Sequence, residues 1–134
     1  MYRVLYIEDE VDMVEDLPVV LEQWGLEVVA NQSIEAALSV FAQGPFDAAL
    51  LDICMPPASN MLLEDVEHGR ETGVAVARRL KQLRPRTPII ALTVVNDPEI
   101  KSRMYQAGIC HIINKPCDPQ PIAETIVNII RRSS

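Results

Sequence analysis

The sequence predicts an open, doubly wound α/β domain in which a sheet of five parallel strands lies between two layers made by five helices. Short apolar runs alternate five times with longer segments whose apolar residues recur at helical spacing. The runs are continuously apolar, which is typical of strands buried on both faces. The 134 residues suffice for a single domain, 1–134, but are too few for the eight units of a closed barrel.

The first unit combines a strand expected at residues 4–7 with a helix that follows the acidic stretch after it. Gly25 is the expected end of that helix, since glycine is common just past a helix C-terminus. Pro18 lies inside the helical pattern, where proline either kinks a helix or marks its first turn. The inward face of this helix is predicted to carry four apolar residues at helical spacing: Val14, Leu17, Leu21 and Trp24.

The second and third strands are expected at residues 28–30 and 48–51, and the third ends at Asp52. Ser33 is a natural N-cap for the helix between these two strands. The inward face of that helix is predicted to be Ile34, Ala37, Leu38 and Phe41.

The second half of the chain repeats this alternation. Strands are expected at residues 88–92, ending at Thr93, and at residues 109–113, ending just before Lys115. Gly108 is the expected stop of the helix between them. The apolar faces of the three helices in this half are predicted at Val76, Leu80 and Leu83, at Ile100, Met104 and Ala107, and at Ile122, Ile126 and Ile129.

Composition excludes several classes of protein. The net charge is −7, which argues against a sequence-independent nucleic-acid binder, so no direct nucleic-acid partner is expected. The apolar stretches are too short for a membrane-spanning helix or a secretory signal, and no membrane partner is expected. The irregular spacing of the three cysteines predicts reduced thiols in a cytoplasmic protein: Cys54, Cys110 and Cys117.

The charges are unevenly divided along the chain. Residues 1–71 contain 15 acidic and 2 basic residues, whereas residues 72–134 contain 4 acidic and 10 basic residues. The acids of the first half are interleaved with apolar residues, so they belong to folded elements and not to an acidic tail. Most of them are expected to form solvated helix faces.

Polar side chains follow four of the five predicted strands. Glu8 and Asp9 follow the first strand, Asp52 the third, Thr93 the fourth and Lys115 the fifth. Ligands of an open parallel sheet bind at the carboxyl ends of its strands, so these groups are expected to share one rim. Clustered carboxylates repel unless a cation is present, and Mg²⁺ is the hard ion that best suits carboxylates together with phosphate oxygens. The combination is typical of phosphoryl transfer.

Four motifs, each at the end of a predicted strand and in the right order, resemble the receiver domain of two-component response regulators over essentially the whole chain. They are VLYIEDE (4–10), ALLDICMP (49–56), IIALT (89–93) and NKP (114–116). The resemblance implies a flavodoxin-like receiver fold. It further implies that Asp52 is the phosphoacceptor.

The same resemblance implies a Mg²⁺ site and a phosphoryl-binding site. Glu8 and Asp9 would hold the ion together with Asp52, with Glu8 acting through water and Cys54 contributing only its backbone carbonyl. Lys115 is implied to pair with Asp52 and with a phosphoryl oxygen. Thr93, the third residue of the catalytic set with Asp52 and Lys115, would hydrogen-bond the phosphoryl group.

A sensor histidine kinase or a phosphotransfer protein is the phosphoryl donor that the resemblance implies. The chain would catalyse its own phosphorylation and slow hydrolysis without being a turnover enzyme. A downstream protein partner is expected on the face made by the fourth strand, fourth helix, fifth strand and fifth helix, and a homodimer is compatible with this scheme.

The chain departs from the usual receiver pattern at several positions. Ile112 stands where the family favours the Tyr or Phe of its switch, Val94 stands where a small residue is usual, and Cys117 replaces a common Phe. Residues 57–72 form an insertion between the third strand and the third helix, with four acids of its own. This long loop is either a lid or partner contact, or a tolerated surface insertion.

Two alternative functions stay open at this point. The first is a receiver-fold interaction module that signals without phosphate. The intact Asp52, Thr93 and Lys115 oppose it, whereas Ile112 and Val94 keep it open. The second is a hydrolase that passes through an aspartyl phosphate. The DxDxT motif expected of such an enzyme is absent, and its nucleophile would follow the first strand and not the third.

Overall fold

A computed structural model describes residues 2–8, 11–31, 33–52, 72–93, 98–115 and 118–133. Five strands form one sheet: β1 (Tyr2–Ile7), β2 (Leu26–Asn31), β3 (Ala48–Asp52), β4 (Ile89–Thr93) and β5 (Ile109–Asn114). Five helices alternate with them: α1 (Val11–Gln23), α2 (Ile34–Gln43), α3 (Thr72–Leu83), α4 (Pro98–Gln106) and α5 (Pro119–Ser133). Every strand pair is parallel and the spatial order is β2-β1-β3-β4-β5. The predicted open, doubly wound five-stranded sheet is therefore confirmed.

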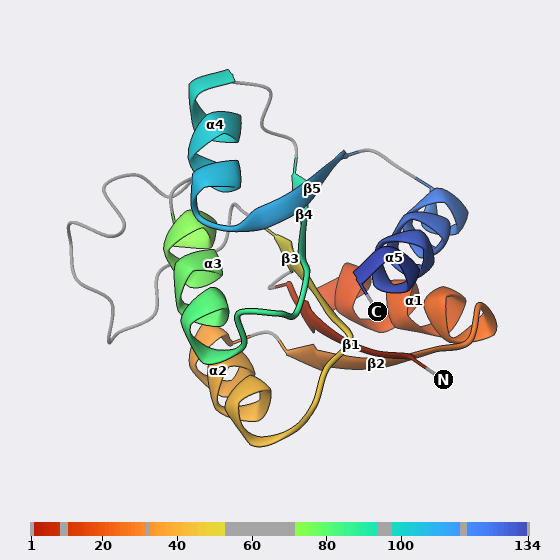
Figure 1. Ribbon diagram of the computed structural model, residues 1–134. Helices are drawn as coiled ribbons and strands as arrows, with labels where there is room; N and C mark the ends of the chain where they lie inside the picture. Colours follow the sequence, from red (N-terminus) through yellow and green to blue (C-terminus); the bar gives the residue numbers. More distant parts are fainter. Residues whose placement is uncertain are drawn as a thin grey trace.

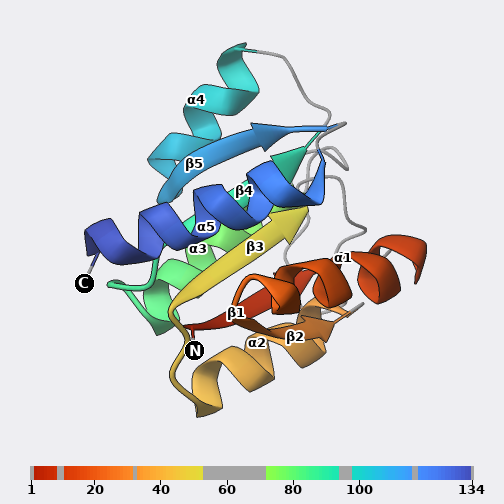
Figure 2. The ribbon, with the colours of Figure 1, turned by 90° about the vertical axis from the view of Figure 1, so that its right-hand side faces the viewer.

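The helices cover the sheet in two layers. Helices α1 and α5 pack together on one face, whereas α2, α3 and α4 follow one another across the other face (Figures 1 and 2). The layers arise because the chain first winds from β1 to β2 and then returns past β1 to β3, so that later crossovers run in the opposite direction along the sheet. The point of reversal lies between β1 and β3.

Two apolar clusters fill the space between the sheet and its helices. Side chains of β1 alternate between them: Leu5 and Ile7 face α2, α3 and α4, whereas Val4 and Tyr6 face α1 and α5. All of the residues of β4 are buried, as expected for a strand with neighbours on both edges. The edge strand β5 is more open, and its residues Cys110 and His111 are exposed.

The local signals read from the sequence mark several real element ends. Gly25 has a φ of +84° and separates α1 from β2, which begins two residues earlier than predicted, at Leu26. Ser33 caps α2 by accepting a hydrogen bond from the Ala36 backbone N–H at 3.3 Å. Pro18 lies within α1 and not in its first turn.

Two residues predicted to face inward do not. Trp24 is 42% exposed because α1 ends at Gln23 and Trp24 lies in the turn that follows, with its backbone N–H bonded to the Leu21 carbonyl. Leu83, at the end of α3, is 45% exposed. Both positions continue the helical spacing in sequence, but each lies at or beyond the end of its helix, where the sheet no longer covers it.

The insertion predicted at residues 57–72 falls in the sequence between β3 and α3. Its residues 57–71 lie outside the described part of the chain, and the last predicted residue, Thr72, is the first residue of α3. Within the described residues, no helix combines the length and the apolar character needed to cross a membrane.

Candidate functional site at the carboxyl ends of the strands

Glu8 follows β1 directly and is completely buried. Its backbone N–H donates to the carbonyl of Asn31, at the end of the neighbouring strand β2, over 3.1 Å. This bond continues the β1–β2 ladder by one residue and fixes where the Glu8 side chain leaves the sheet. Burying a carboxylate costs free energy unless a cation pairs with it. The Glu8 carboxylate therefore needs a partner at this position.

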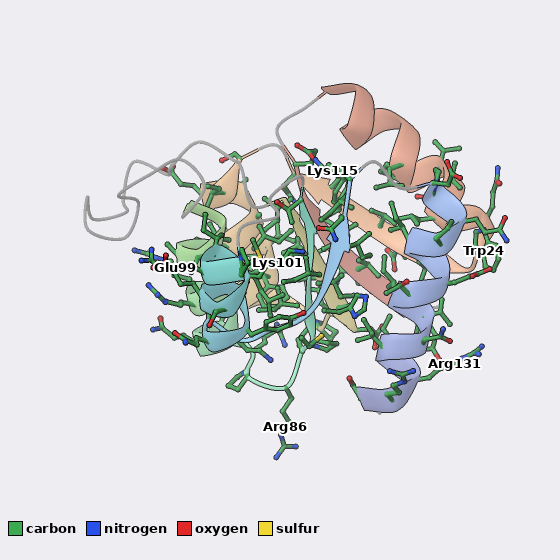
Figure 3. All side chains as sticks on the ribbon, turned by 90° about the horizontal axis from the view of Figure 1, so that it is seen from above. Trp24, Arg86, Glu99, Lys101, Lys115 and Arg131 are labelled. Carbon is green, nitrogen blue, oxygen red and sulfur yellow. The ribbon has the colours of Figure 1, made fainter. Side chains whose placement is uncertain are left out.

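Lys115 supplies a cation to that carboxylate. Its Nζ lies 3.1 Å from Oε2 of Glu8, and the side chain of Lys115 is 19% exposed whereas that of Glu8 is 1% exposed. The backbone N–H of Lys115 donates to the Thr93 carbonyl over 2.7 Å, which extends the β4–β5 ladder and anchors the lysine at the rim. Figure 3 shows Lys115 at the end of β5.

This ion pair spans the central strands of the sheet. Because β3 and β4 lie between β1 and β5 in the spatial order, a contact from Lys115 to Glu8 crosses the ends of both strands. Those ends are Asp52 and Thr93. Four of the five residues predicted to share one rim thus lie at the same edge of the sheet, whereas the fifth, Asp9, lies outside the described residues.

Strand register places Asp52 and Thr93 within that span. Asp52 closes β3 opposite Leu92 of β4, and the preceding pair joins Leu51 to Ile7 of β1, so Asp52 stands one step beyond Ile7, at the level of Glu8. Asp52 is described here through its backbone only. Thr93 closes β4 and is completely buried.

Several predicted site residues lie outside the described part of the chain. They are Asp9 and Cys54, both predicted around the metal, together with Val94 and Cys117. Among the residues that are described, no three His, Cys, Asp or Glu side chains form a group able to hold a metal ion. The assignment of the ligands therefore stays a prediction.

The donor chemistry at the rim fits a hard divalent cation. Glu8 brings a buried carboxylate to the edge, and the backbone of Asp52 ends beside it. Oxygen ligands of this kind suit Mg²⁺, which usually binds through one or two carboxylates, waters and phosphate oxygens. Glu8, Asp9 and Asp52, with the Cys54 carbonyl, are the residues that could hold such an ion.

The Lys115–Glu8 contact was not singled out from the sequence. The predicted pairing of Lys115 with Asp52 stays a prediction, because the Asp52 side chain lies outside the described part of the structure, and the structure adds a contact with Glu8 across 107 positions of sequence. The sequence carried one signal for this contact, namely opposite charges at the ends of two strands of one parallel sheet. It gave no strand order, so the distance between the two charges was unknown.

Ile112 takes part in the packing beside this rim. It lies in β5 and is partly buried against the apolar cluster beneath α2, α3 and α4. An aliphatic side chain therefore occupies the position at which the resemblance to receiver domains led us to expect Tyr or Phe.

Comparisons of sequence and of structure both match this chain to response regulator receiver domains. A sequence model of the response regulator receiver domain matches residues 4–127. PhoB, a phosphate regulon transcriptional regulatory protein of Escherichia coli, is 27% identical over 98% of this chain and 53% of its own length. ZraR, a transcriptional regulatory protein of Salmonella typhimurium, is 26% identical over 92% of this chain and 25% of its own length. The sensor protein GacS of Pseudomonas syringae is 28% identical over 93% of this chain and 13% of its own length.

The chain therefore spans about half or less of the curated relatives that it matches. Solved structures match it over nearly its whole length. A CheY-like response regulator receiver domain protein from Methanospirillum hungatei superimposes with a TM-score of 0.84, 22% identity and coverage of 99% of this chain and 96% of that one. For a putative response regulator from Chloroflexus aurantiacus the TM-score is 0.79, with 27% identity and 98% coverage of both chains.

The match of the family model spans β1 through most of α5, and the same five-stranded parallel sheet recurs in the matching structures. The chain belongs to the response regulator receiver domain family of two-component systems.

Proposed function

We propose that this receiver domain is a Mg²⁺-dependent phosphoacceptor in a two-component phosphorelay, with Asp52 as the residue that accepts the phosphoryl group. The observation that carries the proposal is the Lys115–Glu8 ion pair, which crosses the strand ends at Asp52 and Thr93. The proposal is supported by the complete burial of Glu8 at the end of β1 and of Thr93 at the end of β4, because β1 and β4 are the two neighbours of β3.

In the proposed reaction, a carboxylate oxygen of Asp52 attacks the phosphorus of a phosphohistidine on the donor protein. The O–P bond forms as the P–N bond breaks, and the electron pair of that bond returns to the imidazole, which leaves as the neutral base after taking up a proton. The acceptor thereby becomes an aspartyl phosphate. Each copy accepts one phosphoryl group until hydrolysis removes it, so the chain is not a turnover enzyme.

Lys115 and Thr93 would stabilise the phosphoryl group. The ammonium of Lys115, which is partly exposed and anchored by its backbone to β4, can turn from Glu8 towards a phosphoryl oxygen. The Thr93 hydroxyl would donate a hydrogen bond to another oxygen of the group. Both interactions strengthen as negative charge gathers on the phosphoryl oxygens.

Glu8, Asp9 and Asp52, with the backbone carbonyl of Cys54, would hold Mg²⁺. When bound, the ion supplies positive charge that neutralises the acceptor and the incoming phosphoryl group. The complete burial of Glu8 supports a role in holding the ion, because the fold fixes the position of its carboxylate at the rim.

The relatives suggest which proteins exchange signals with this domain. Similar sequences occur within a sensor protein, GacS, and within two transcriptional regulatory proteins, PhoB and ZraR. We propose a sensor histidine kinase or phosphotransfer protein as donor, in the cytoplasm, where the free thiol of Cys110 is stable. The downstream partner is proposed to bind the surface of β4, α4, β5 and α5, next to Thr93 and Lys115, where added phosphoryl charge would alter packing.

Phosphorylation of Asp52 is directly testable. The purified chain is incubated with Mg²⁺ and acetyl phosphate, and intact-protein mass spectrometry measures the phosphoryl adduct. We expect an adduct in the wild type and none in Asp52→Asn. Asp118→Asn is the matched control, since Asp118 is exposed and lies just before α5, and it should be labelled like the wild type. Equal labelling of the Asp52 variant would refute the assignment.

A phosphate-independent interaction module is the second candidate. The observation that favours it is Ile112, whose aliphatic side chain packs into the core where an aromatic switch residue is usual. An NMR titration with Mg²⁺ and beryllofluoride separates the two functions. Anion-dependent shifts at Thr93 and along β5 support phosphoacceptor signalling, whereas metal binding without any such shift supports the module.

A further inference from the structure

The two outer strands of the sheet, β2 and β5, differ in regularity. In β4, Ile89 and Ile90 are consecutive, yet they pair with Ile109 and His111 of β5, so Cys110 has no counterpart. Such a bulge on an edge strand hinders the addition of a further strand. In contrast, β2 pairs with β1 residue by residue along its whole length, without any shift in register. Figures 1 and 2 show β2 at the margin of the sheet.

The backbone hydrogen-bonding groups of β2 alternate in direction. The Asn31 carbonyl accepts a hydrogen bond from the Glu8 N–H at 3.1 Å, so the groups of Asn31 point towards β1. Successive residues of a strand direct their N–H and C=O groups to opposite edges, so Glu27 and Val29 also direct theirs to β1. The residues of β2 whose groups point away from the sheet are Leu26, Val28 and Ala30.

The outward edge of β2 is open to a further strand. Among the strands that the structure describes, none lies beyond β2, so its outward groups have no strand partner there. Val28 and Ala30 are half-buried against the apolar cluster beneath α1 and α5, and Val29 is half-buried on the other face. Edge strands are usually protected by lysine, proline or a bulge. The sequence of β2, LEVVAN, has none of these and a single charge, Glu27.

We propose that β2 pairs with β2 of a second copy of this chain, antiparallel and about a two-fold axis that passes at Val28. In antiparallel pairs, residues whose backbone groups face each other exchange two hydrogen bonds. With Val28 opposite Val28 of the second copy, Leu26 lies opposite Ala30, and Ala30 opposite Leu26. All three outward-directed residues then gain partners at once, and the two sheets become one continuous sheet.

The occupant is a second copy because β2 is complementary to itself. In this register Glu27 lies opposite Val29 of the second copy, so no like charges face each other. Two copies of Val28 form a β-branched cross-strand pair, and each covers the exposed part of the other. Moving the axis to Leu26 or Ala30 would leave about half of β2 without a partner. The same patch on both copies thus supplies a closed, two-fold interface.

This pairing is independent of the proposed phosphoacceptor chemistry. Since β2 and β5 are opposite edges of the sheet, the dimer leaves the surface of β4, α4, β5 and α5 free for a downstream partner. A pair of strand edges is a small interface, so we expect a dissociation constant on the order of 100 μM. The charge of −7 on each copy opposes association, and salt at about 0.3 M screens that repulsion.

Sedimentation equilibrium of the unphosphorylated chain in this salt, from about 10 μM to about 1 mM, tests the proposal. Val28→Lys and Val28→Glu each place two like charges opposite each other at the two-fold axis. Each variant alone should raise the dissociation constant about ten-fold or more. An equimolar mixture of the two variants places Lys opposite Glu, and should restore association to within about three-fold of the wild type.

His111→Lys and His111→Glu are the matched controls, because His111 is exposed on the other edge strand. Alone or mixed, they should associate like the wild type. Circular dichroism checks the folding of each variant. Amide hydrogen exchange of the wild type, followed by NMR, tests the same edge without substitution. The N–H groups of Val28 and Ala30 should exchange several-fold more slowly at about 1 mM than at about 10 μM, whereas those of β5 should not change.

The proposal is supported by a wild-type dimer that each Val28 variant weakens and their mixture restores. It is overturned by a wild type that stays monomeric at millimolar concentration, by a mixture that associates no better than either variant alone, or by equal losses in the His111 variants. A wild type that stays monomeric but binds a synthetic peptide of the sequence LEVVAN would assign the edge to a strand of another protein, and would likewise overturn the pairing of two copies.

Discussion

Replacing Lys115 with Met tests whether the ion pair at the rim is an energetic link between β5 and β1. The substitution keeps most of the apolar stem and removes the ammonium that lies 3.1 Å from Glu8. The Glu8 side chain is 1% exposed, so its carboxylate would lose a cation in a place that water scarcely reaches. A double-mutant cycle with Glu8→Gln then isolates the interaction between the two charges.

The expected magnitude follows from the burial of the two partners. Breaking a fully buried ion pair costs about 3–5 kcal/mol, and the 19% exposure of Lys115 lets solvent screen part of this, so we expect about 2–3 kcal/mol. In the Glu8→Gln background the same substitution should cost about 1 kcal/mol or less, because the Glu8 carboxylate is no longer there to lose its cation. The coupling free energy is therefore about 2 kcal/mol.

Urea unfolding followed by circular dichroism, without Mg²⁺, measures each corner of the cycle. With a slope of about 2 kcal/mol/M, Lys115→Met should lower the midpoint by about 1–1.5 M. Lys101→Met on α4 is the control and should change stability by no more than about 0.5 kcal/mol. The reasoning is refuted if Lys115→Met costs the same in both backgrounds, since the lysine would then act through its stem and not through Glu8.

Two other features of the chain allow measurements of a different kind. Gly108 has a φ of +105°, and a methyl group there would meet Cγ of Lys81 at 2.5 Å, whereas Gly25, at +84°, has open space around it. Gly108→Ala should therefore lower the free energy of unfolding, measured in urea, by about 2–3 kcal/mol, and Gly25→Ala should lower it by about 1 kcal/mol. Equal decreases would show that the Lys81 side chain moves aside freely. Cys110 is exposed as a residue but its sulfur is partly buried, and this partial burial raises the pKa of the thiol, an effect that the Lys81 ammonium partly offsets. Alkylation of Cys110 by iodoacetamide, followed by peptide mass spectrometry against pH, should thus have a higher midpoint in the folded chain than in urea, and coincident midpoints would contradict this direction.

Much of the fold could be predicted from local sequence. Continuous apolar runs at 48–51 and 88–92 are buried strands, Ser33 caps a helix, and Gly25 and Gly108 have positive φ at turns. Each of these features depends on a few neighbouring residues, so periodicity and capping rules suffice to find it. The polar residues that follow the strands could likewise be placed at one edge, because parallel strands all point the same way.

Exposure at the ends of helices could not be predicted in the same manner. Trp24 and Leu83 continue the helical repeat of their segments, yet both are more than 40% exposed. Their burial depends on how far the sheet extends beneath each helix end, which is a property of the assembled layers and not of the repeat.

By itself the sequence determined the five strand–helix units and the chemical character of the rim: carboxylates after the first and third strands, a hydroxyl after the fourth and an ammonium after the fifth. Only the tertiary structure decided that β3 and β4 lie between β1 and β5, and that Lys115 therefore reaches Glu8 across the ends of both. The physical reason is that strand order comes from the packing of α1 and α5 on one face and α2 to α4 on the other, which involves contacts between residues far apart in the chain.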